Sequence, residues 1–278
     1  MASNANSQSG TFNQGYNPGV TPYYAGAGAS PAYQQNPELG QEIPKPHADP
    51  SVASPNFQFT EKSLRLGFIR KVYSILTLQL LVTFGFVALC VLEENIKRFV
   101  QANYWIVLIA WAIIFTTVIL LTCFRNVART SPGNYIILSV LTLAMSLAVG
   151  TSASLFEAEE VIMAMGITVA MTLALTAFSF QTKYDFTYRH GFLLIGLIGL
   201  IFFGMFAGIW HSRVLGVFYG FLGAMVFGMF LVVDTQLMLG GRHKFSYSPE
   251  DYIFAALSLY LDIINMFLYI LQIFGASR

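Results

Sequence analysis

Seven long apolar segments dominate this chain and limit what it can fold into. They lie near residues 70–92, 104–124, 134–154, 160–180, 191–210, 213–239 and 252–274, and short polar breaks separate them. A helix needs about 20 apolar residues to cross the hydrocarbon core of a bilayer. Only helices and closed barrels satisfy their backbone hydrogen bonds in that core. The pattern predicts an all-α integral membrane protein with seven transmembrane helices, the last of which either crosses the bilayer or re-enters.

The composition agrees with a membrane protein and excludes several other classes. Of the 278 residues, 55% are hydrophobic and only 10% are charged, whereas soluble domains carry about 25% charged residues. The net charge of +1 excludes a nucleic-acid binder that works by bulk charge. Two cysteines, Cys90 and Cys123, are too few for a disulfide scaffold and lack the spacing of a zinc site.

The chain divides near residue 57 into two parts of different composition. Residues 1–56 are rich in Pro, Gly, Tyr and Gln and contain no run that could bury much apolar surface. Such a segment cannot offset the entropy of ordering it, so we predict a disordered tail before a membrane domain at 57–278. Asn17-Pro18 and Pro31-Ala32-Tyr33 are candidate docking motifs, but such short patterns recur by chance, which favours a merely solvated tail.

Basic residues in the short loops predict the orientation. With a cytosolic tail, ten of them face the cytosol: Lys62, Arg65, Arg70, Lys71, Arg125, Arg129, Lys183, Arg189, Arg242 and Lys244. The other side holds Lys97, Arg98 and Arg213, and also Arg278 if the last helix crosses. Because cytosolic loops are enriched in Lys and Arg, ten against four predicts a cytosolic N-terminus.

Glycines and turn residues predict where helices approach each other and where they end. Gly204/Gly208 and Gly216/Gly220 have the four-residue spacing that lets helices pack closely in lipid, and we expect a packing role for them rather than a hinge. Gly240-Gly241 predicts a break after the sixth span. Ser248 followed by Pro249 predicts the start of the seventh helix.

Two acids lie well inside apolar spans, and they are the candidate functional residues. Asp234 and Asp262 each have apolar neighbours, whereas the other twelve acids fall in the tail, in loops or at span ends. Ionisable groups in a membrane usually mark an ion or proton path, although a buried pair can also serve only to hold helices together. Two carboxylates that meet in a low dielectric cannot both ionise easily, so they tend to share a proton. Their expected depths differ by about 8 Å at 1.5 Å per residue, unless the seventh helix begins higher in the headgroups.

Arg125, at the cytosolic end of the second span, is the basic residue that we expect to reach this pair, and its alternative role is that of an ordinary interfacial arginine. An enzyme has no positive support. The four histidines (His47, His190, His211 and His243) lie far apart in the tail and loops, and no nucleotide-binding loop is present. We therefore expect no enzymatic activity and no cofactor.

Several motifs resemble those of the transmembrane Bax-inhibitor-motif family, in its Lifeguard branch. Residues 68–73 (Phe-Ile-Arg-Lys-Val-Tyr) and 79–83 (Gln-Leu-Leu-Val-Thr) resemble the family's first helix. Residues 233–236 (Val-Asp-Thr-Gln), 250–252 (Glu-Asp-Tyr) and 258–265 (Ser-Leu-Tyr-Leu-Asp-Ile-Ile-Asn) resemble its sixth and seventh helices. The last motif is the most specific, and the similarity spans roughly residues 58–275.

The resemblance implies a fold and a function. It implies seven helices with the seventh central. It also implies a protein that leaks calcium and restrains apoptosis, located in the endoplasmic reticulum, the Golgi or another membrane. In the family's bacterial relatives an aspartate pair on the last two helices forms an ion or proton gate, and an arginine on the second helix latches it. Asp234 and Asp262 match the pair and are expected to contact calcium transiently, and Arg125 matches the latch by position. The mid-span acid of those relatives has no counterpart in residues 111–115.

Two functions therefore remain open. The first is a pH-sensitive calcium leak channel, whose partners are membrane lipid and calcium ions. The second is a non-conducting membrane scaffold that binds cell-death regulatory proteins or calcium channels. A proton-coupled transporter lacks the internal repeat that such folds show.

Overall fold

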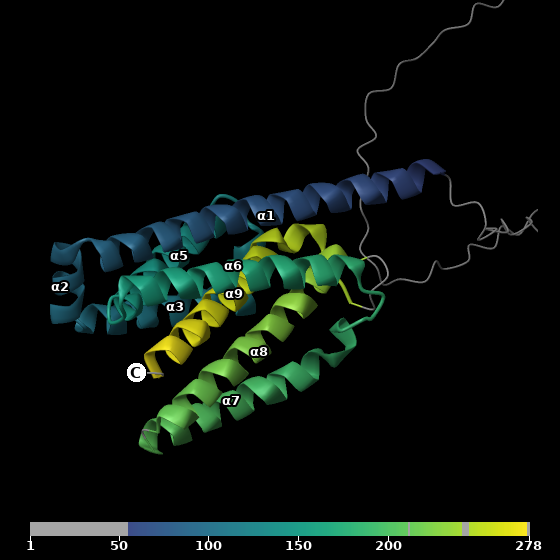
Figure 1. Ribbon diagram of the computed structural model, residues 1–278. Helices are drawn as coiled ribbons and strands as arrows, with labels where there is room; N and C mark the ends of the chain where they lie inside the picture. Colours follow the sequence, from purple (N-terminus) through teal and green to yellow (C-terminus); the bar gives the residue numbers. More distant parts are fainter. Residues whose placement is uncertain (1–54, 211, 241–244, 277–278) are drawn as a thin grey trace, which may run out of the picture. The chain divides into compact units, whose positions relative to one another are not determined.

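The structure is a computed structural model that describes residues 55–210, 212–240 and 245–276, without the side chains of residues 55–62, 125, 189 and 190. The predicted tail at 1–56 therefore lies almost wholly outside the described residues. Seven described helices are long and apolar enough to cross a membrane: α1 (Pro55–Leu92), α3 (Trp105–Cys123), α5 (Gly133–Ala153), α6 (Ala158–Gln181), α7 (His190–Trp210), α8 (Arg213–Leu239) and α9 (Tyr252–Ala276) (Figure 1). Short helices join them: α2 (Glu94–Ala102), α4 (Arg125–Arg129), η1 (Thr187–Arg189) and η2 (Pro249–Asp251). The predicted all-α multi-pass architecture is confirmed.

The ends of the helices differ from the predicted spans mainly at α1. The predicted span begins at residue 70, but the helix begins at Pro55, a residue type favoured in a first helical turn. Hydropathy identifies only the part of a helix that lies in hydrocarbon, so it misses polar turns that extend beyond it. The same limit explains why α2 and α4, which are polar, were not predicted.

Helix α9 lies at the centre of the bundle. It packs against α8, α1, α6 and α5, and among the seven candidate spans it is the most buried. Tyr260 and Phe267 on α9 are completely buried. The helix is unbroken over 25 residues, which is long enough to cross a bilayer. Ser248 precedes η2 as predicted, although its side chain makes no capping hydrogen bond.

Glycines bring α8 close to α9. A Cβ atom on Gly220 would lie 2.8 Å from the carbonyl oxygen of Tyr269, and one on Gly216 would lie 2.9 Å from the Cβ atom of Ala276. Gly204 on α7 similarly faces Tyr219 on α8. These three positions support the predicted packing role, whereas a Cβ atom at Gly208 would have no neighbour within 4 Å.

Candidate functional site

The two intramembrane aspartates meet in the interior of the bundle. Asp234 lies near the C-terminal end of α8, and Asp262 lies in the middle of α9. Each residue is only 5% exposed. Their carboxyl groups are close enough to interact as hydrogen-bonding partners and as charges. The depth difference of about 8 Å expected from the sequence therefore does not keep the two groups apart. We call Asp234 and Asp262 the carboxyl pair.

The two members of the carboxyl pair have different surroundings. The Tyr247 hydroxyl donates a hydrogen bond of 3.3 Å to Oδ1 of Asp234, and the Ser258 side chain also lies beside Asp234. By contrast, Oδ2 of Asp262 is buried and has no hydrogen-bond partner among the described residues. An unpaired buried carboxyl oxygen is costly. A proton, a water molecule or a cation at Asp262 would remove that cost.

Tyr247 remains a hydrogen-bond donor over the whole physiological pH range. It lies in the segment between α8 and η2, outside the spans. Burial raises the pKa of Tyr247 well above its usual value near 10, and the negative charge of Asp234 raises it further. A neutral phenol can donate to a carboxylate, whereas a phenolate would repel it.

The predicted latch residue, Arg125, cannot be assigned a contact. Its backbone begins α4, which packs against α5, η2 and α9, but its side chain lies outside the described residues. A latch formed by Arg125 therefore stays a prediction.

A different arginine, Arg65, is hydrogen-bonded to the C-terminal end of α8, the end that carries Asp234. Arg65 on α1 donates three hydrogen bonds to backbone carbonyl oxygens: 3.0 Å to Leu237, 3.0 Å to Leu239 and 2.7 Å to Tyr247. The sequence placed Arg65 only among the cytosolic basic residues, and Tyr247 was not predicted at all. Since Arg65 is more than 170 positions away from its partners, no local pattern could have revealed these contacts.

Further contacts hold the start of the seventh helix at the same end of the bundle. Arg129 on α4 forms ion pairs with Asp251 at 2.8 Å and with Glu250 at 3.2 Å. The Lys71 ammonium lies 3.3 Å from the centre of the Tyr252 ring, which is a cation–π distance. These contacts attach α4 and α1 to the segment that leads to Asp262.

The described residues offer no resident metal centre. They contain no group of three or more His, Cys, Asp or Glu side chains that could hold a metal ion. Calcium takes 6–8 oxygen ligands, so the two carboxyl groups with Ser258 and Tyr247 are too few to retain it.

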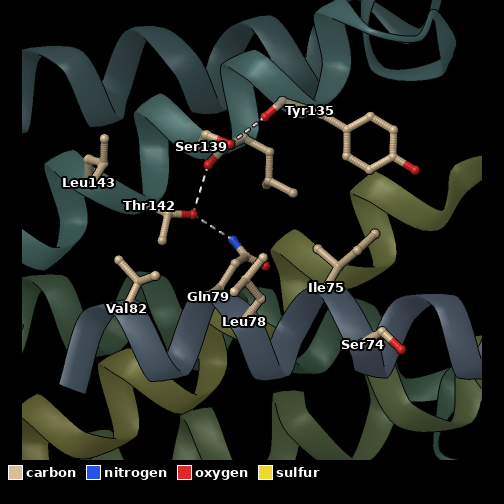
Figure 2. Close-up of a pocket in the computed structure, with 10 residues that line it drawn as sticks. Ser74, Ile75, Leu78, Gln79, Val82, Tyr135, Ser139, Thr142 and Leu143 are labelled. Atoms are coloured by element: carbon tan, nitrogen blue, oxygen red, sulfur yellow. Dashed lines mark hydrogen bonds between the residues drawn. The ribbon is translucent and has the colours of Figure 1, made fainter. Parts of the chain in front are cut away.

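A layer of hydrogen-bonded hydroxyl and amide groups joins α1, α5 and α9. Gln79 on α1 donates a 3.0 Å hydrogen bond to Thr142 on α5, at the floor of a groove of about 410 Å³ between these helices (Figure 2). One turn farther along α1, Thr83 is hydrogen-bonded to Ser146 at 3.0 Å and to Tyr260 at 2.8 Å. The sequence does not reveal this layer, because single hydroxyl and amide groups are common in membrane helices and do not stand out as acids do.

Comparison with known proteins relates this arrangement to a family. Residues 65–278 match the family model described as "Inhibitor of apoptosis-promoting Bax1". The chain is 35% identical to human Protein lifeguard 3, over 93% of this chain and 89% of that protein, and 34% identical to the mouse Protein lifeguard 3, over 90% and 89%. It is also 35% identical to Bax inhibitor 1 of Schizosaccharomyces pombe, over 90% of both chains.

Proposed function

Because this chain belongs to the Bax inhibitor and lifeguard family of multi-pass membrane proteins, we propose that it is a pH-sensitive calcium leak channel of intracellular membranes that lowers store calcium and restrains apoptosis. One observation carries the proposal: the only two acids placed well inside the apolar spans, Asp234 and Asp262, are buried and lie side by side. Intramembrane acids that face a bundle interior usually belong to an ion or proton path.

The carboxyl pair accounts for sensitivity to pH. With Asp234 ionised, Tyr247 and Ser258 hydrogen-bond to it, and the bond from Ser258 holds α8 and α9 together at this point. Protonation removes the charge and weakens these bonds, since hydrogen bonds to charged groups are the stronger ones. Protons also compete with calcium for the same oxygens, because calcium prefers ionised ligands. If Arg125 latches the closed state, it adds a charge that only an ionised Asp234 can match.

Calcium flux in liposomes that contain only this protein tests the proposal. We expect flux to depend on pH. We expect Asp234→Asn to leave the leak open at every pH, because an amide cannot replace the charge. Asp262→Asn removes the proton-sharing partner, so closure should persist into more acidic solution. Glu94→Gln, an exposed acid of α2 that is paired with Arg98, is the control and should not change the curve.

The same experiment decides for or against the alternative function. If the protein conducts no calcium, or if both single variants and the double variant reproduce the unmodified flux–pH curve, the carboxyl pair is structural. The protein would then be a scaffold that binds cell-death regulators or calcium channels. Localisation in the endoplasmic reticulum or Golgi, with a cytosolic N-terminus, belongs to the proposed channel function.

A further inference from the structure

The end of α8 is held by a side chain from another helix. The last carbonyl groups of a helix have no partners within it and carry partial negative charge, which a cation there neutralises. Arg65 donates to two of them, those of Leu237 and Leu239. Gly240 follows with φ of +59°, and a Cβ atom at this position would collide with the guanidinium group of Arg65. The glycine therefore leaves space for Arg65, and it also adopts the positive φ that ends the helix.

Both backbone polar groups of Tyr247, its N–H and its carbonyl oxygen, are hydrogen-bonded. Its N–H donates a 2.9 Å hydrogen bond to the carbonyl oxygen of Leu237, and its own carbonyl oxygen accepts from Arg65 at 2.7 Å. Its ring packs edge-on against Phe254 of α9, with ring centres 5.6 Å apart. The hydroxyl group at the far end of this fixed side chain reaches Asp234. Arg65 and Asp234 thus contact the same residue from opposite sides.

We propose that Arg65 is a positioning residue for the carboxyl pair, and that it acts through Tyr247. This inference rests on the proposed function, since it assigns a role within the same gate. Arg65 holds the end of α8 and the backbone of Tyr247 so that the tyrosine hydroxyl donates to Asp234. A hydroxyl donor favours the ionised carboxylate over the neutral acid. The arrangement therefore stabilises the ionised, closed state.

Asp234 also has hydrogen-bonding neighbours other than Tyr247. In the part of the chain that the structure describes, the titratable side chains that face Asp234 are Tyr247 and Asp262, and Ser258 is a neutral neighbour. Asp262 and Ser258 also hydrogen-bond to Asp234, so Tyr247 is one of three partners that favour its ionised form. Arg65 makes its hydrogen bonds to backbone carbonyl groups rather than to the carboxyl group.

Calcium flux of the full chain in liposomes, measured across pH, tests the coupling of the two residues. We expect Tyr247→Phe and Arg65→Gln each to move the half-maximal pH upward by about one unit, the scale of a hydrogen bond to a charged group. The double variant should shift no farther than the larger single shift. Arg65→Lys should resemble Arg65→Gln, because an ammonium group cannot span the three carbonyl groups. Arg98→Gln, which removes an exposed arginine paired with Glu94 one turn away on α2, is the control.

A second readout does not require conduction. A hydrophobic carbodiimide reacts with protonated carboxyl groups in membranes, and peptide mass spectrometry measures its addition to Asp234 as a function of pH. Tyr247→Phe should move this reaction to higher pH. If the unmodified protein conducts no calcium but the reaction still shifts in both variants, the proposed function fails and the inference stands.

Two results would overturn the inference alone. One is a flux that depends on the carboxyl pair while Tyr247→Phe changes neither flux nor carbodiimide reaction. The other is a double variant whose shift equals the sum of the two single shifts, because Arg65 would then act by a separate route. If Arg65→Gln fails to insert, Tyr247→Phe, which removes a single oxygen atom, still decides the question.

Discussion

Thr83 shows how single hydroxyl groups organise the interior of this bundle. Its side chain is completely buried on α1 and is hydrogen-bonded to Ser146 of α5 and Tyr260 of α9. The Tyr260 hydroxyl is buried in turn, two positions from Asp262 on the next half-turn of α9. Thr83 therefore joins three helices, α1, α5 and α9.

Replacing Thr83 with valine removes one oxygen atom and keeps the side-chain shape. We expect the free energy of unfolding in detergent micelles to fall by about 0.6–1.5 kcal/mol, because Tyr260 loses its partner in an apolar interior. Thr77→Val is the matched control, since Thr77 is exposed and its hydroxyl is bonded to the Tyr73 carbonyl oxygen of its own helix. An equal loss in both variants would mean that the interhelical hydrogen bonds contribute nothing.

The raised pKa of Tyr247 predicts how stability changes in alkaline solution. Below the usual tyrosine value near 10, this residue is protonated in both the folded and the unfolded state, so it has no effect on the pH dependence. Above that value the unfolded chain gains a phenolate that the folded state resists, and stability falls as pH rises. We expect the loss of stability between pH 10 and pH 11.5 to be smaller in Tyr247→Phe than in the unmodified protein, as measured by thermal unfolding. An identical loss in both proteins would show that Tyr247 ionises freely in the fold.

At the scale of elements, the contact between α8 and α9 determines whether the carboxyl pair can form. Gly220 and Gly223 leave space for Tyr269, whose hydroxyl also lies 3.2 Å from that of Tyr219. Larger residues at these positions would separate the two helices, and with them the aspartates.

Gly223→Ala tests this close packing. A Cβ atom at Gly223 would collide with the Tyr269 ring, so we expect a loss of about 1–3 kcal/mol in the free energy of unfolding, the usual effect of overpacking. Gly208→Ala, at a helix position with no neighbour for the added methyl group, should be neutral or slightly stabilising. The contrary outcome is a larger loss at Gly208 than at Gly223 in the same thermal unfolding assay.

The sequence predicts these elements well because a bilayer imposes a strong pattern on a chain that crosses it. Apolar runs predicted all seven spans, and the motifs around Asp234 and Asp262 predicted a family that the comparisons confirm. Both aspartates stood out because acids are rare in apolar spans. Arg65 and Tyr247 did not stand out, because their role depends on contacts between distant segments at a helix end, where polar residues are ordinary.

At the scale of the whole molecule, the number of candidate spans predicts the sides of the termini: if all seven cross the membrane, the two termini lie on opposite sides. The seven candidate spans end with α9, whose last turn lies beside Phe156 in the connection between α5 and α6. In the same region, Gln101 of α2 donates a 2.6 Å hydrogen bond to the carbonyl oxygen of Ser154. Figure 1 shows α2 and the C-terminal end at the same end of the bundle. Arg65, Tyr247 and the start of α9 lie at the other end.

The excess of basic residues predicts which of these ends faces the cytosol. A tag on the N-terminal tail should be digested by protease added to sealed vesicles from the cytosolic side, and a tag at the C-terminus should be protected until detergent is added. A tag in the α3–α5 connection, which carries Arg129, is the internal control and should be digested with the N-terminal one. This orientation places Asp234, Tyr247 and Arg65 toward the cytosol, so cytosolic acidification is the signal that the carboxyl pair would sense. Protection of the N-terminal tag would reverse the molecule, and the same residues would then respond to the pH of the compartment on the far side.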